Sequence, residues 1–81
     1  MIAKVVVTLK KSVLDPQGVA VKHALDSLGF SAVQSVRLGK YLEVRMDGAD
    51  PKKAEKDLKE MCDKLLSNPV IEEYKFEILK D

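Results

Sequence analysis

The stretch that most constrains the fold of this 81-residue chain runs from Val33 to Asp47. Apolar and polar residues alternate on both sides of Gly39 and Lys40, and such alternation is typical of half-buried strands. We therefore predict two short strands that meet at these two residues, with the other elements placed around them. One long bent strand would give the same alternation and stays open as an alternative.

The register of the two strands follows from their apolar residues. A two-residue turn at Gly39-Lys40 would place the apolar residues of the two strands on opposite faces of the sheet, because each step along a strand reverses the side chain. Pairing Leu38 with Leu42 brings these residues onto one face. The sequence therefore predicts a three-residue loop or a bulge that includes Tyr41, with the tyrosine exposed or in an interface.

The remaining elements follow from the residues on either side of this stretch. Residues 2–10 alternate and are rich in β-branched side chains, which predicts a first strand, and residues 70–79 predict the last one. Helices are predicted after Asp15-Pro16 and after Asp50-Pro51, since aspartate caps a helix and proline suits its first turn. The predicted order is β-α-β-β-α-β.

This order predicts an α+β fold, a two-layer sandwich in which residues 1–81 form one domain. Because β-α-β crossovers are right-handed, the simplest solution is a four-stranded antiparallel sheet with two helices on one face, the ferredoxin-like topology. The helix faces expected against the sheet carry Val21, Ala24, Leu25 and Leu28 in the first helix and Ala54, Leu58, Met61, Cys62 and Leu65 in the second.

The composition argues against several classes of protein. A net charge of +1 with both signs interspersed argues against nucleic acid as an obligatory partner. One cysteine excludes a disulfide within the chain, and one cysteine with one histidine argues against a closed metal site. The sequence shows neither a membrane-spanning apolar run nor a signal peptide, so we expect a cytoplasmic protein.

The residues indicate a protein that binds other proteins better than they indicate an enzyme. Phosphate-binding loop motifs are missing, and Cys62 lies in an apolar helical stripe, which favours a core residue over a nucleophile. Ile2 and Val6 lie on the outer face of the first strand, where another subunit could cover them; scattered surface aliphatics are an equally good explanation. An interaction subunit ranks first, a small-ligand regulatory domain second.

Three separated motifs give the chain a family resemblance. They are SVLDPQG at Ser12–Gly18, VRLGKYLE at Val36–Glu43 and MCDKLLSNPVIE at Met61–Glu72. In this order, and over nearly the whole length, they resemble the small-subunit family of phosphoribosylformylglycinamidine synthase, often called PurS.

The resemblance implies a role in purine biosynthesis. In that family a large synthase subunit binds ATP, with magnesium, and formylglycinamide ribonucleotide, and a glutaminase subunit releases ammonia from glutamine. The small subunit associates with itself, as a dimer or a dimer of dimers, and is needed to assemble the other two. The resemblance therefore implies no catalytic, metal-binding or cofactor-binding residue in this chain. A stand-alone ligand-sensing domain of similar topology is the competing interpretation.

The expected contacts lie near the predicted hairpin. Arg37, Lys40 and Tyr41 at its tip are our candidates for binding the partner subunits. Ile2, Val6 and Tyr41 are our candidates for self-association. In the alternative, purely structural interpretation, Arg37 only pairs with Glu43 across the hairpin and Gly39-Lys40 only turns the chain.

Overall fold

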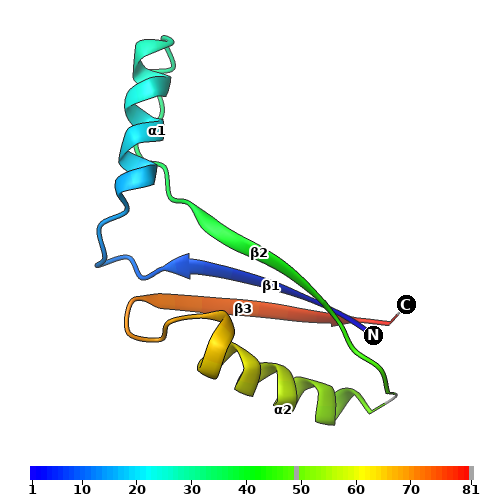
Figure 1. Cartoon of the computed structure of the whole chain (residues 1–81). Helices are drawn as coiled ribbons and strands as arrows, with labels where there is room; N and C mark the ends of the chain where they lie inside the picture. The colour runs from blue at the N-terminus through cyan, green and yellow to red at the C-terminus, as the bar shows by residue number, and fades with distance from the viewer. Residues whose placement is uncertain (49, 81) are drawn as a thin grey trace.

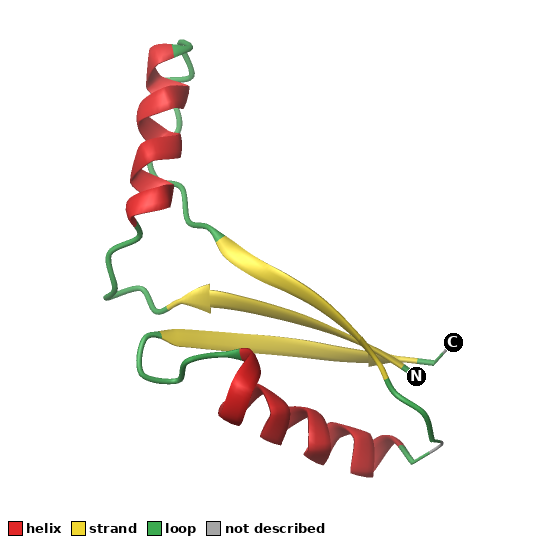
Figure 2. Ribbon diagram, in the orientation of Figure 1, coloured by secondary structure: helices red, strands yellow, loops and turns green. Residues whose placement is uncertain are grey.

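The computed structural model describes residues 1–48 and 50–80. In chain order its elements are β1 (Ile2–Leu9), α1 (Pro16–Ser27), β2 (Gly39–Arg45), α2 (Pro51–Met61), a π-helical turn (Cys62–Leu66) and β3 (Glu72–Leu79). The strands form an antiparallel sheet in the order β2-β1-β3, and α2 lies along one face of it (Figures 1 and 2). The α+β class predicted from the sequence is therefore confirmed.

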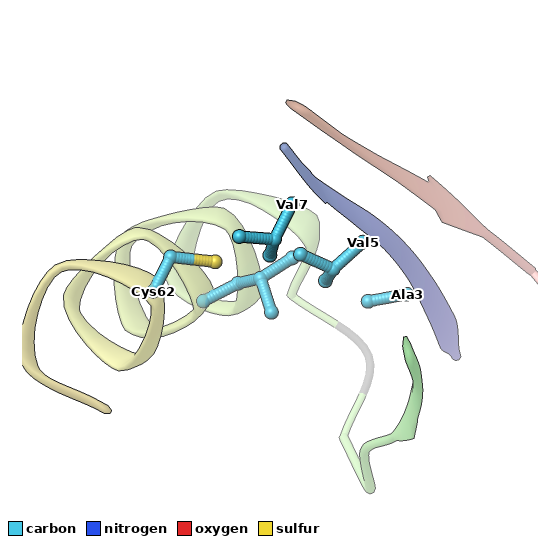
Figure 3. Packing of buried hydrophobic residues seen from close by; sticks show 5 residues of the cluster. Ala3, Val5, Val7 and Cys62 are labelled. Carbon is cyan, nitrogen blue, oxygen red and sulfur yellow. The ribbon is translucent and has the colours of Figure 1, made fainter. Parts of the chain in front are cut away.

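The core lies between the central strand and α2. Ala3, Val5 and Val7 of β1 are fully buried, and they form one cluster with Leu58 of α2 and Cys62 of the π-helical turn. Figure 3 shows Cys62 on the helix that faces the three β1 residues. These β1 residues lie at every second position and the two helical residues are four apart, so each element presents one continuous apolar face. Partly buried residues of the flanking strands extend this core: Leu42, Val44, Tyr74, Phe76 and Ile78.

Helix α2 begins as predicted but ends in a wider turn. The Asp50 side chain caps it by accepting a 3.0 Å hydrogen bond from the Lys52 amide. At its other end the Ser67 amide donates to the Cys62 carbonyl, five residues earlier, at 3.0 Å. The extra residue in this turn directs Leu66 toward the core and leaves Leu65 82% exposed, contrary to its predicted place in the buried stripe.

The predicted fourth strand is not formed in the described residues, and the predicted loop at Gly39–Tyr41 is wrong. The three residues lie inside β2, paired with Thr8, Val7 and Val6 of β1. The long-strand alternative is closer to the structure, because β2 continues from residues 33–38 without a turn. Pairing with the apolar central strand gives Gly39–Tyr41 three more ladder positions than a hairpin loop would.

The prediction that both helices share one face of the sheet is also wrong. Helix α1 and the returning residues 30–38 stand away from the sheet as an arm, which we define as residues 16–38 (Figure 1). The described chain measures 50 × 28 × 14 Å, and its radius of gyration is 16.2 Å. A compact chain of this length would have a radius of about 12 Å. The arm therefore gains no cover from the sheet of its own chain.

Helix α1 nevertheless begins at the cap that the sequence predicts. Asp15 caps its start, and Gly29 follows its end with φ at +95°, a conformation that glycine adopts readily. Its apolar stripe, however, packs against little: Val21 is exposed, and Leu28 is 72% exposed. Local sequence signals set the helix, whereas the other described residues cover little of its apolar stripe.

Truncating the core residue Leu58 tests the position of α2. We expect Leu58→Ala to lower the free energy of unfolding by about 2–5 kcal/mol, because Leu58 is fully buried. Urea denaturation followed by circular dichroism measures this loss. The matched control on the exposed face, Glu55→Ala, should change stability by less than about 0.5 kcal/mol. Equal losses in the two variants would contradict the described orientation of α2.

Candidate functional site

The outer face of the sheet, opposite α2, carries two of the residues predicted for self-association side by side. Val6 of β1 lies directly opposite Tyr41 of β2 in the antiparallel ladder. Val6 is 42% exposed and Tyr41 is 56% exposed. The predicted outward position of Tyr41 is therefore confirmed, although a strand and not a loop places it there.

Ile2 belongs to the same face but lies further along it. It is partly buried and sits between Arg45 of β2 and Leu79 of β3. Between Ile2 and Val6 comes Lys4, whose neighbours across the sheet are both glutamates, Glu43 and Glu77. The outer face is thus made of two small apolar groups that a row of alternating charges separates.

Arg37 has a structural role at the base of the arm. Its Nη2 donates to the Lys10 carbonyl at 2.9 Å and to the Val13 carbonyl at 3.0 Å. The predicted cross-strand pair with Glu43 is absent, because Glu43 lies opposite Lys4 of β1. Arg37 therefore ties the connection between β1 and α1 to the start of β2, while its side chain is still exposed.

Lys40 and Tyr41, predicted as neighbouring partner contacts, point to opposite faces of β2. Lys40 lies opposite Val7, on the inner face, and its Nζ is 3.7 Å from Oε2 of Glu72. Tyr41 lies on the outer face. Because there is no hairpin tip, the structure does not bring Arg37, Lys40 and Tyr41 together in one surface.

Asp15 links the arm to the sheet in a way that the sequence did not reveal. One of its carboxylate oxygens accepts from the Gly18 amide at 3.0 Å, as a helix cap does, and the other accepts from the Leu38 amide at 2.7 Å. These two hydrogen bonds lower the pKa of this buried carboxyl below its usual value. The bond from Leu38 has the larger effect and the bond from Gly18 the smaller one. The cap motif predicted only the first of these bonds.

An apolar groove lies beside α2. It has a volume of about 430 Å³ and is lined by Val44 of β2 and by Met61, Leu65 and Leu66 at the end of the helix. Asp57, Glu60 and Lys64 contribute its polar margin. The groove could not be predicted from the sequence, because it depends on the wider turn Cys62–Leu66 at the end of the helix.

The reactive side chains of the interior have structural roles. Cys62 is fully buried, as predicted for a core residue, and burial raises the pKa of its thiol. The Tyr74 hydroxyl donates to Asp63 at 2.8 Å, which raises the pKa of the tyrosine to about 12. Residues 1–48 and 50–80 contain no cluster of three metal-ligating side chains and no helix long and apolar enough to cross a membrane.

Comparison with known proteins decides the family. The sequence matches the PurS family, described as phosphoribosylformylglycinamidine (FGAM) synthase, over residues 2–80. The chain belongs to the PurS family. It is 53% identical over 79 residues to the FGAM synthase subunit PurS of Bacillus subtilis, a match that covers 93% of this chain and 88% of the relative. Membership makes the chain a subunit of FGAM synthase, in purine biosynthesis.

Solved PurS structures share the fold. The Bacillus subtilis PurS crystal structure superposes with a TM-score of 0.88 at 51% identity and covers 98% of both chains. A chain of the PurLQS structure from Thermotoga maritima superposes with a TM-score of 0.83 at 31% identity, covering 98% of this chain and 99% of that one. The elongated shape, with its arm, is therefore typical of the family.

The double role of Asp15 can be tested by comparison with Asp50, which acts as a helix cap. Asparagine is as good a cap as aspartate, but it has one acceptor oxygen where Asp15 uses two. We expect Asp15→Asn to lower the urea midpoint of unfolding. Asp50→Asn should leave it nearly unchanged, because Asp50 caps α2 through the Lys52 amide, and an asparagine oxygen can accept the same hydrogen bond.

The effect of Asp15 should depend on pH. Because its folded pKa lies below the unfolded value of about 3.9, its contribution is complete above that value and is lost as the pH falls through the folded pKa. The difference between the parent and Asp15→Asn should therefore be constant near neutral pH and shrink in strong acid. A difference that grows on acidification would contradict this role.

Proposed function

We propose that this chain is a non-catalytic assembly subunit that bridges the large synthase subunit and the glutaminase subunit of FGAM synthase. The observation that carries the proposal is the match, over almost the full length of both chains, to a chain of the PurLQS assembly of Thermotoga maritima. That match favours a subunit of a complex over a stand-alone ligand sensor. The proposal treats residues 1–81 as one domain and places the complex in the cytoplasm.

Catalysis is assigned to the partner subunits. ATP and magnesium bind to the large subunit in this proposal, and the glutaminase subunit supplies ammonia for conversion of formylglycinamide ribonucleotide to its amidine. The state of the Cys62 thiol supports this division, because a buried thiol with a raised pKa makes a poor nucleophile. The contribution of this chain is the surfaces that it presents.

Self-association through the arm is supported by the apolar residues that the arm leaves uncovered. Val19, Val21, Leu28 and Phe30 are all large and exposed. Soluble monomers seldom expose this much apolar surface along one projecting element. A second copy of this chain is the partner we propose, since the sheet of each copy has an apolar groove to offer in return.

The groove beside α2 is where a ferredoxin-like sheet would carry its other helix. The observed strand order matches that topology except for its fourth, edge strand, and α2 alone covers the inner face. We assign the vacant positions to the arm of the second copy: its α1 fills the groove at Val44, Met61 and Leu65, and its residues 33–38 add to the edge at β2. Each half of the dimer is then a complete four-stranded sandwich.

The outer face provides a second contact. Ile2, Val6 and Tyr41 remain uncovered when arms are exchanged, because α1 would lie on the opposite face. This face is available for pairing two dimers or for binding the partner subunits. Arg37 and Lys40, on the arm and on the inner face, stay candidates for partner contacts near the crossing between the two chains.

The groove can be tested by placing a charge in it. Leu65→Lys should weaken the dimer at least about tenfold, because a lysine ammonium in an apolar contact loses its hydration. Sedimentation over a dilution series measures the dissociation constant. Val70→Lys is the matched control, since Val70 is 78% exposed and lies outside the residues lining the groove. Equal dissociation constants for Leu65→Lys and the parent would contradict arm exchange.

Assembly can be tested directly with the partner subunits. The chain is mixed with large and glutaminase subunits in the presence of nucleotide and glutamine, and sizing chromatography follows the complex. We expect co-elution of the parent and weaker co-elution of the double variant Lys40→Ala/Tyr41→Ala. The single variants show whether the inner or the outer face of β2 is responsible. Unchanged glutamine-dependent turnover of the double variant would remove both residues from the interface.

A further inference from the structure

We infer that Leu38-Gly39 is the hinge between the arm and the sheet, and that neighbouring contacts keep its backbone extended. The extended hinge prevents the arm from folding back onto the sheet of its own chain. The inference rests on the proposed arm exchange and goes beyond it, because it names the residues that select the exchanged form over a closed monomer. The closed monomer would be the four-stranded sandwich predicted from the sequence.

Pairing between β1 and β2 opposes a turn at this junction. Closing the chain with a loop at Gly39-Lys40-Tyr41 would remove all three residues from their ladder with Thr8, Val7 and Val6. These are three of the seven paired positions of β2. A tighter turn at Gly39-Lys40 would keep one of them but would turn the apolar residues before it to the wrong face of the sheet. No unpaired residues are therefore available between the arm and β2 to form a loop of the required length.

A latch at the base of the arm holds the same junction extended. The Leu38 amide donates to the Asp15 carboxylate at 2.7 Å, and the Arg37 guanidinium bridges the Lys10 and Val13 carbonyls. These contacts join the two segments that connect arm and sheet, so that one cannot bend without the other.

Close backbone packing completes the latch. A Cβ atom on Gly18 would lie 2.1 Å from the Val36 carbonyl oxygen, so the first turn of α1 is in tight contact with the returning segment. Gly39 is similarly close to β1, where a Cβ would lie 2.6 Å from the Val7 carbonyl oxygen. The backbone is thus packed against neighbours on both sides of the hinge.

Two added residues should release the hinge. Insertion of the dipeptide Pro-Asp between Leu38 and Gly39 creates the loop Pro-Asp-Gly, in which a type I turn is followed by glycine in the left-handed conformation. Lys40 and Tyr41 can then stay paired with β1. Because the loop has three residues, Val36 returns on the inner face, as the apolar pattern requires. The arm can then reach its own groove.

The experiment compares this variant with an insertion of equal length that forms no turn. Thr-Val at the same place favours extended backbone and should leave the chain dimeric. We expect the Pro-Asp variant to have half the mass of the parent by sedimentation equilibrium. Its melting temperature should be independent of concentration, unlike that of a dimer. A dimeric Pro-Asp variant, or a monomeric Thr-Val variant, would overturn the inference.

Two further outcomes separate the hinge from the proposed dimer. If the parent itself is a monomer, arm exchange is wrong, and small-angle scattering decides on the hinge: a smaller radius of gyration for Pro-Asp than for Thr-Val supports it, and equal radii overturn it. If the Pro-Asp variant does not unfold cooperatively, Asn-Asp at the same place supplies a second turn with the same glycine. Failure of both, while Thr-Val folds, would show that no closed form exists and would overturn the inference.

Discussion

The pairing of β1 with a strand on each side is the constraint on which the rest of the structure depends. Ala3, Val5 and Val7 need cover on one face, and α2 gives it through Leu58 and Cys62. The same strand gives β2 a partner along its whole length, from Gly39 to Arg45. The backbone hydrogen-bonding groups of β2 are paired in this way from its first residue. A turn at that point would break several of these pairs, so the arm extends away from the sheet.

Signals confined to a few neighbouring residues could be predicted from the sequence. The caps at Asp15 and Asp50 depend on local geometry, and both are present. Tyr41 is exposed as predicted, but the loop from which its exposure is predicted does not form. The course of residues 33–45 could not be predicted in the same way. Its apolar alternation suits a hairpin and a long strand equally, and the choice depends on pairing with a strand about 35 residues earlier in the chain.

The candidate contact residues show the same difference between local signals and long-range pairing. Val6 and Tyr41 share a face because period-two alternation fixes the face of every strand residue. Only a hairpin tip would bring Arg37, Lys40 and Tyr41 together. That tip does not form, and the three residues lie in three different surroundings. The groove at Leu65 depends on a single five-residue turn at the end of α2, which propensity and periodicity do not reveal.

The hydrogen bonds of Asp15 have a mechanical consequence. Helix α1 has 12 residues and is therefore about 18 Å long, so it acts as a lever with its fulcrum at this carboxylate. A tilt of about 10° at the base moves the far end of such a lever by about 3 Å, which is enough to separate side chains in van der Waals contact. A small change in the backbone angle at residue 15 thus becomes a large displacement at Leu28. If the arm docks as proposed, accurate contacts at its far end require a rigid base.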